Sequence, residues 1–199
     1  MAINRVLQSS VQNGLPKFDG VWNGISAVGS MEPISAITLS ANQANIEFNN
    51  IPSTYTHLQL RGFLRGTYVD AIQRVSLNLT FNNTASNSTS YADHDLNGDG
   101  SVVTATGYAS TSQINIPFIP NASATSNIFG VLIIDILDYA NTNKYKVARS
   151  ICGHDRNGAG YISLNSGLYM STNAISSIKI EPYYDQLATN STLSLYGIK

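Results

Sequence analysis

Residues 129–151 read FGVLIIDILDYANTNKYKVARSI, and this stretch decides the fold that the sequence predicts. Two runs rich in apolar residues flank the polar segment ANTN at 140–143, whose composition is typical of a turn. We therefore predict a β-hairpin with a four-residue loop, in which Tyr139 pairs with Lys144 and Asp135 pairs with Ala148. The face predicted to point into the core carries Leu132, Ile134, Ile136, Tyr145, Val147 and Ile151.

The opposite face of the first hairpin strand is also apolar. It carries the large side chains of Val131, Ile133, Leu137 and Tyr139 beside Asp135. A face exposed to solvent rarely holds so many large apolar residues together, so we expect another part of the protein or another molecule to cover it. The N-terminal segment or a second subunit could do so, and the interleaved polar residues favour the subunit.

Alternation of apolar and polar residues continues along the chain from residue 34 onward. Segment 74–81, RVSLNLTF, places Val75, Leu77, Leu79 and Phe81 on one side and predicts a half-buried strand. Clusters of Asn, Gly, Ser and Asp separate such segments, and no stretch keeps a helical period for long. The sequence thus predicts an all-β, jelly-roll-like antiparallel β-sandwich over residues 34–199. The other expected strands lie at 34–39, 44–48, 57–64, 101–108, 113–118, 128–139, 144–152, 160–164, 175–181 and 193–198.

Residues 1–33 differ in texture from the rest of the chain. Glycine and proline recur through them, and neither a strand period nor a helical period is maintained. Scattered apolar residues make the segment too hydrophobic for a free linker, so we predict an extended N-terminal arm that docks onto its own domain or onto a neighbouring subunit. The predicted anchors are Leu15, Phe18, Val21, Trp22 and Ile25.

The chain is polar without being charged. Charged residues make up 12% of it, and the formal net charge is −1. A nucleic-acid interface and a polybasic membrane surface both need clustered Lys and Arg, so neither partner is expected. The single cysteine, Cys152, excludes an intramolecular disulfide and a Cys-rich zinc site. The longest apolar run, FGVLII at 129–134, falls well short of the roughly 20 residues that span a bilayer, and the N-terminus lacks the apolar centre of a secretory signal.

Residues 93–100, DHDLNGDG, place oxygen-bearing side chains at alternate positions before glycine. This spacing is typical of a calcium-binding loop, but such loops carry a bidentate carboxylate at their twelfth position, where Thr104 or Thr106 stands here. Asn-Gly and Asp-Gly are equally typical of a tight hairpin turn. We therefore predict a surface turn and no cofactor, with calcium as the minor alternative. Its candidate ligands are Asp93, Asp95, Asn97 and Asp99.

The sequence contains no recognisable catalytic motif. Cys152 and His154 would share one face of a strand, but no third group or oxyanion hole accompanies them, and a buried cysteine beside a polar turn explains both. We expect a protein without enzymatic activity. Tyrosines near loops could stack on sugar rings, or fill the rim of the core or an interface instead. They are Tyr68, Tyr91, Tyr108, Tyr183 and Tyr184.

Three segments together carry a family resemblance. They read IPSTYTHLQLR at 51–61, DILDYANTNKYK at 135–146 and SLYGIK at 194–199. They resemble a group of structural proteins of tailed-bacteriophage virions, and the resemblance covers about residues 34–199. It implies a β-sandwich on the outside of a virion, either decorating the capsid or forming part of a tail fibre, and it implies no catalytic residues.

We accordingly expect a capsid decoration (cement) protein on the outer surface of the phage particle, assembled in the cytoplasm of the bacterial host. A homotrimer would fit the local three-fold positions of an icosahedral shell, and the arm at 1–33 would grip the major capsid protein or other virion proteins. The alternative is a tail-fibre or receptor-binding module that recognises host surface glycans. The absence of a repetitive shaft from the sequence favours decoration.

Overall fold

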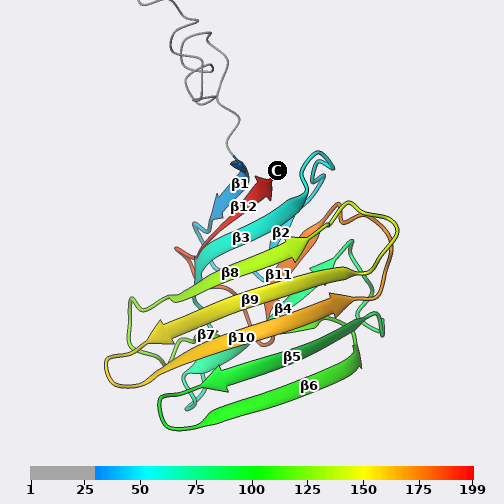
Figure 1. Ribbon diagram of the computed structural model, residues 1–199. Helices are drawn as coiled ribbons and strands as arrows, with labels where there is room; N and C mark the ends of the chain where they lie inside the picture. Colours follow the sequence, from blue (N-terminus) through cyan, green and yellow to red (C-terminus); the bar gives the residue numbers. More distant parts are fainter. Residues whose placement is uncertain (1–29) are drawn as a thin grey trace, which may run out of the picture. The chain divides into compact units, whose positions relative to one another are not determined.

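The computed structural model describes residues 30–199, so the predicted arm anchors Leu15, Phe18, Val21, Trp22 and Ile25 lie outside the described residues. By its internal contacts the chain divides into Met1–Glu32 and Pro33–Lys199. Within the described range there are twelve strands and no helix (Figure 1). The strands are β1 (Met31–Thr38), β2 (Ile46–Phe48), β3 (His57–Leu64), β4 (Arg74–Phe81), β5 (Tyr91–Gly98), β6 (Val103–Thr111), β7 (Ile114–Pro120), β8 (Gly130–Leu137), β9 (Lys146–Asp155), β10 (Gly160–Tyr169), β11 (Ile178–Pro182) and β12 (Thr192–Ile198).

The strands form two sheets that pack as a sandwich. The larger sheet has eight strands in the order β1-β12-β3-β8-β9-β10-β5-β6, and the smaller has four in the order β2-β11-β4-β7. Every pair with a described register is antiparallel. In Figure 1 the larger sheet faces the reader, and β4, β7 and β11 lie behind it. The all-β antiparallel sandwich is thus confirmed, whereas the jelly-roll connectivity stays a prediction.

The core lies between the two sheets and follows the predicted alternation. Strand β4 turns Val75, Leu77, Leu79 and Phe81 inward, and all four are buried, as RVSLNLTF predicts. Strand β8 turns Leu132, Ile134 and Ile136 toward them from the larger sheet, and these three are fully buried. Burial of such side chains contributes roughly 1.5–3 kcal/mol each, so the inner faces of β4 and β8 form a major part of the hydrophobic core.

The predicted register of the β8–β9 hairpin is wrong by one residue. Leu137 pairs with Val147 and Asp135 with Arg149, one position later on β9 than predicted. Since side chains alternate between the faces of a strand, a shift of one residue moves each of them to the other face. Val147 and Ile151 therefore point away from the core and are 40% and 48% exposed. Tyr145, also expected in the core, is exposed, and the inward positions of β9 hold Lys146, Ala148, Ser150 and Cys152 instead.

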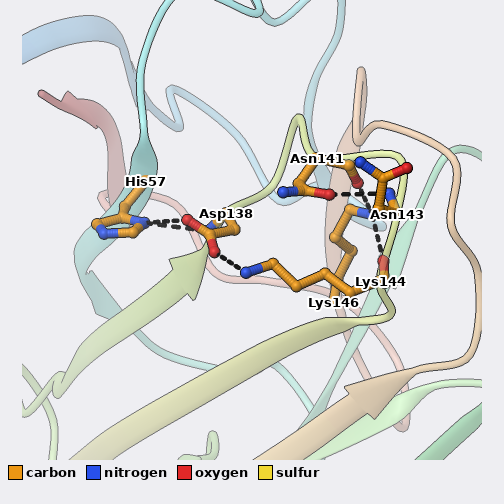
Figure 2. Close-up of polar contacts among 6 residues, drawn as sticks. All are labelled: His57, Asp138, Asn141, Asn143, Lys144 and Lys146. Carbon is orange, nitrogen blue, oxygen red and sulfur yellow. Dashed lines mark hydrogen bonds and ion pairs between the residues drawn. The ribbon is translucent and has the colours of Figure 1, made fainter.

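The loop of this hairpin is longer than the predicted four residues, and tertiary contacts hold it. Figure 2 shows Lys146 reaching back under the loop, where its Nζ donates hydrogen bonds to the carbonyl oxygens of Asn141 and Lys144. A third acceptor, the carbonyl oxygen of Thr172, lies 3.2 Å from the same Nζ. Tyr139 is fully buried and its hydroxyl donates to the carbonyl oxygen of Pro52. Tyr139 is therefore a core residue, and its predicted place on an interface is wrong.

Asp138 starts the loop with a left-handed backbone (φ 49°). Its backbone N–H donates to Nδ1 of His57 at 3.0 Å, and its carboxylate forms an ion pair with Lys144 (Figure 2). A ring nitrogen that accepts an amide proton carries no proton of its own, so the 3.5 Å approach of His57 Nδ1 to Asp138 Oδ1 is not an ion pair in this state. The hydrogen bond from Lys144 is the main cause that lowers the pKa of Asp138 below its ordinary value.

The smaller sheet covers only part of the larger one. Strand β7, at an edge of the smaller sheet, contacts β8, β9, β10 and β5, while β6 is exposed along almost its whole length. The sandwich is therefore open at its β5–β6 end, where the inner face of the larger sheet meets the free edge of β7.

Candidate functional site

The face of the eight-stranded sheet that points away from the core carries large apolar side chains on six neighbouring strands. We call this surface the outer face. It comprises the face predicted around Val131, Ile133 and Leu137 and extends it to both sides, since these three residues point away from the core as predicted. Its apolar members are Phe63, Leu96, Val103, Val131, Ile133, Leu137, Val147, Ile151, Ile162 and Leu164.

Strand register arranges the outer face in rows. One apolar row crosses β8, β9, β10 and β5 through Ile133, Ile151, Leu164 and Leu96. A second runs along the adjoining positions through Phe63, Val131, Ile162 and Val103. Cross-strand apolar pairs stabilise a sheet by contact with one another. Most of these side chains are nevertheless 40% or more exposed, so their neighbours in the sheet cover them only in part.

A polar row separates these apolar rows from Leu137 and Val147. It consists of Gln59, Asp135, Arg149, Ser166 and His94, which succeed one another across β3, β8, β9, β10 and β5. Gln59 Nε2 donates to Asp135 Oδ1 at 2.6 Å. Asp135 stands directly opposite Arg149, so the row presents both signs of charge within an apolar surface.

The second apolar row is interrupted by glycine. Gly153 stands between Val131 and Ile162 in the register, where any side chain would fill the surface between them. A hollow of about 530 Å³ lies there, with Phe129 and Ile133 among its walls. The outer face is thus indented near the beginning of β8 and the end of β9, and the indentation is large enough to receive a side chain from another molecule.

The inner face of the same sheet is polar where the smaller sheet stops covering it. Asp93, Asp95 and Asn97 of β5 and Ser163 and Asn165 of β10 point inward and are buried. This reverses the usual relation between polarity and burial, so each of these groups requires hydrogen-bond partners.

The free edge of β7 supplies several of these partners. Asp93 Oδ1 accepts from the backbone N–H of Asn115 at 3.4 Å, and Asn165 Nδ2 donates to the Asn115 carbonyl oxygen at 2.7 Å. Cys152 Sγ donates to the carbonyl oxygen of Pro117. Side chains of one sheet therefore cap the unpaired backbone groups of the other, which closes an edge that would otherwise be open to pairing.

The structure places Asp93, Asp95 and Asn97 on one strand and Asp99 in the turn that follows it. Residues 91–98 form strand β5 rather than the predicted surface turn, so Asp93, Asp95 and Asn97 succeed one another along the strand instead of curling around a point. Asp99 lies in the turn to β6, where its Oδ1 accepts from the backbone N–H groups of Ser101 and Val102, both at 2.8 Å. Among residues 30–199 there is no group of three or more His, Cys, Asp or Glu that could hold a metal ion.

Burial changes the acidity of the inner carboxylates. It is the main cause that raises the pKa of Asp93 to about 6, and the neighbouring charge of Asp95 adds to it. Burial also raises the pKa of Asp95, against the hydrogen bonds from Asn97 and Thr106. Asp93 Oδ2 has no hydrogen-bond partner within the described part of the chain.

A second hollow opens above Asp93 at the uncovered end of the sandwich. Its volume is about 400 Å³, and β5, β6, β7 and the segment after β11 surround it. Tyr108, Gln113, Asn115, Tyr183 and Tyr184 line it together with Asp93. Three tyrosines that the sequence marks as candidates for sugar stacking thus share one site, whereas Tyr91 is fully buried in the core. Tyr68 stacks on Tyr184 from outside, with ring centroids 4.8 Å apart.

Cys152 and His154 lie on the inner face of β9. Burial raises the pKa of the Cys152 thiol to about 12, and burial is also the main cause that lowers the pKa of His154. A thiol that donates to a backbone carbonyl, with a pKa far above neutrality, is not a nucleophile at physiological pH. The geometry therefore favours packing as the role of Cys152.

Comparison with known proteins identified no relative: no family model, no curated protein and no solved structure matched the chain. Within the described residues, no helix has the length and apolar character needed to cross a membrane.

Most of the outer face was not anticipated from the sequence, although a signal was present. In β5 and β10 the inward positions include Asp93, Asp95 and Asn165, and the outward positions include Leu96, Ile162 and Leu164. Alternation alone cannot say which set faces the core. The inward residues can be polar because the edge of β7 supplies them with hydrogen-bond partners, and the sequence does not show that β7 lies beside them.

Proposed function

We propose that the protein is a non-enzymatic structural component of a phage particle exterior, a capsid decoration protein that assembles into a homo-oligomer, expected to be a trimer, through the outer face. The virion context is drawn from the sequence resemblance. The outer face is the single observation that carries the assembly role, because its apolar rows span six strands of one sheet.

The energetics favour covering this surface. Burying a large apolar side chain contributes roughly 1.5–3 kcal/mol relative to full exposure, and soluble monomers rarely leave wide apolar patches uncovered. The polar row supports a second copy as the cover: Asp135 and Arg149 lie side by side, so one surface offers each charge to its counterpart on another copy.

Further partners of the proposed assembly are the major capsid protein or other virion proteins, bound through the arm at 1–33. The protein would lie on the outer surface of the virion and be assembled in the bacterial cytoplasm. Neither nucleic acid nor a membrane is a partner in this proposal, and no cofactor takes part.

The experiment that tests the proposal places a charge on the outer face. Ile151 lies within an apolar row and is 48% exposed, so Ile151→Lys should leave the sandwich folded but bury an unpaired ammonium in the oligomer. We expect this variant to have the 21.4 kDa mass of one chain in light scattering after gel filtration, and to be lost from particles.

The matched control is Val69→Lys. Val69 is more exposed, at 74%, but lies in the loop between β3 and β4 and not on the outer face. It should oligomerise like the native chain. An Ile151→Lys variant that is folded by circular dichroism and still oligomeric would contradict assembly through this face.

A second candidate is a tail-fibre or receptor-binding module that recognises host glycans. The tyrosine-lined hollow at the open end of the sandwich favours it. Copy number separates the two candidates, because a decoration protein is present in far more copies per particle than a fibre protein. Quantitative mass spectrometry of purified particles measures this number directly.

A further inference from the structure

The hollow at the open end of the sandwich has an aromatic wall. Tyr183 and Tyr184 follow β11, and their rings meet edge to face with centroids 4.6 Å apart. The backbone N–H of Tyr183 donates to the carbonyl oxygen of Ser76 at 2.9 Å, next to the irregularity in the β4–β7 pairing. Tyr68 supports Tyr184 from behind by stacking. The wall is therefore held in place, although both of its rings remain about half exposed.

The opposite side of the hollow combines one aromatic ring with polar groups. Tyr108 of β6 stands opposite Asp93 in the β5–β6 register, and its ring is also about half exposed. Asp93 lies at the base and is 1% exposed. Its Oδ1 accepts a hydrogen bond from the backbone N–H of Asn115, and its Oδ2 has no partner among residues 30–199. The side chains of Gln113 and Asn115 add amide donors and acceptors to the lining.

The charges around the hollow restrict the class of ligand. Among the described residues that line the hollow, Asp93 is the only acidic one, and none is Lys, Arg or His. Phosphates and other anions would meet a carboxylate without a compensating cation. A divalent cation would find one carboxylate, and no cluster of three ligating residues is present in the described part of the chain. A neutral ligand rich in hydroxyl groups is neither an anion nor a metal ion, and the lining can accept it.

We propose that this hollow binds a neutral saccharide, whose apolar ring face packs on Tyr184 and Tyr108 while its hydroxyl groups donate to Asp93 and exchange hydrogen bonds with Gln113 and Asn115. Exposed aromatic faces beside fixed polar groups match the two kinds of surface on a pyranose ring. The volume of about 400 Å³ lies in the ordinary range for small-ligand sites. The site goes beyond the assembly role and does not rest on it, because it uses the opposite face of β5 from the outer face.

The test titrates the full chain with three neutral pentasaccharides, built from α-linked glucose, β-linked glucose and N-acetylglucosamine, and with oligogalacturonate as the acidic comparator. Binding is measured by saturation-transfer NMR and by calorimetry. We expect at least one neutral probe to bind with a Kd on the order of 1 mM or tighter, and oligogalacturonate to show no binding.

Two variants and one control locate the site. Tyr184→Ala and Tyr108→Ala should each weaken binding about fivefold or more, since stacking on an aromatic ring contributes on the order of 1 kcal/mol. Tyr145→Ala should leave binding unchanged: Tyr145 and Tyr184 are equally exposed, at 52%, but Tyr145 lies in the β8–β9 loop. Tyr108 is on the exposed edge strand β6, so its removal tests the site even where loss of the Tyr68–Tyr184 stack impairs folding.

Three results would overturn the proposal: no binding of any neutral probe, equal binding of oligogalacturonate, or unchanged binding by both folded tyrosine variants. Ile151→Lys separates this proposal from the assembly role. It should keep saccharide binding while it loses oligomerisation, so each proposal can fail without the other.

Discussion

Polarity alone suggests that apolar side chains of a sheet are buried and that carboxylates are exposed, and strand β5 of the eight-stranded sheet shows the reverse on both of its faces. On β5, Leu96 points outward and is 48% exposed, while the adjacent Asp95 points inward and is 7% exposed. The inward carboxylates and amides are hydrogen-bonded to one another and to the edge of β7, whereas no other element of residues 30–199 covers the outward apolar residues, which remain about half exposed. The difference teaches that within residues 30–199 the smaller sheet covers most of the inner face, whereas nothing covers the outer face.

Strand β8 shows the same contrast between its two faces with the same type of residue on each. Ile133 and Ile134 are neighbours, but Ile134 is fully buried between the sheets and Ile133 faces outward. Strands that read as continuous apolar runs are usually buried on both faces. The run FGVLII is therefore covered on one face by the smaller sheet, and on its other face by no element of residues 30–199.

The largest effect is expected from removing an inner apolar side chain. Ile134→Ala should lower the free energy of unfolding by about 2–5 kcal/mol, because it leaves a cavity in the core. Ile151→Ala, on the outer face, should change the unfolding of an isolated chain by less than about 1 kcal/mol and act on assembly instead. Chemical denaturation followed by fluorescence, at concentrations low enough to dissociate oligomers, measures both.

An equal loss of stability in the two variants at every protein concentration would mean that the outer side chains are packed within the chain itself. The contrast between the two faces would then be wrong.

The next effect concerns the buried carboxylate at the base of the saccharide hollow. The pKa of Asp93 is raised from 3.8 to about 6 in the folded chain, so between these values the folded state binds more protons than the unfolded state. Stability contributed by protonated Asp93 is complete below about pH 4 and is lost as the pH rises to about 6, by roughly 2–3 kcal/mol. Asp93→Asn should remove this contribution, so the difference in unfolding free energy between the native chain and the variant should fall by this amount between pH 4 and 6.

Asp99 provides the control of opposite sign. Hydrogen bonds from the backbone N–H groups of Val102 and Ser101 lower its pKa, so its contribution is present above the unfolded pKa and lost as the pH falls. Asp99→Asn should flatten the acid side of the profile only. If Asp93→Asn left the profile between pH 4 and 6 unchanged, Asp93 would be hydrated and not buried.

A smaller effect compares the two lysines of the β8–β9 hairpin. Lys146 is fully buried and donates to three carbonyl oxygens, while Lys144 is exposed and pairs with Asp138 (Figure 2). Lys146→Met should cost about 1–2 kcal/mol, because carbonyl groups under the loop lose their donor. Lys144→Met should cost less than about 1 kcal/mol, as is usual for exposed ion pairs. The melting temperatures of the two variants, measured side by side, decide whether the buried hydrogen bonds of Lys146 or the exposed ion pair of Lys144 contributes more to the stability of the loop.

Local pattern was sufficient to predict the class of fold and the inner face of β4 and β8. Strands β3 and β4 were placed at their observed bounds because alternation of apolar and polar residues is strict there. The register of β9 could not be predicted in this way. Its loop is set by contacts of Tyr139 with Pro52 and of Lys146 with Thr172, which are distant in sequence, and a four-residue turn is the local default.

The same limit explains the error at residues 93–100. Asp93, Asp95 and Asn97 have the composition of a turn, and only the edge of β7 makes a buried strand of them acceptable. The tyrosines of the hollow were recognised individually as candidates, but their convergence on Asp93 depends on the pairing of β5 with β6 and on the chain returning after β11.

The most direct test of the central claim is the mass of the native full chain as a function of concentration, measured by sedimentation velocity. The incomplete outer face predicts an oligomer whose mass is a multiple of 21.4 kDa at micromolar concentration, three chains being the expected number, and a shift to the single-chain mass in Ile151→Lys. A native chain that sediments at 21.4 kDa across the whole concentration range would contradict the account, since the outer face would then be stable in water without a second copy.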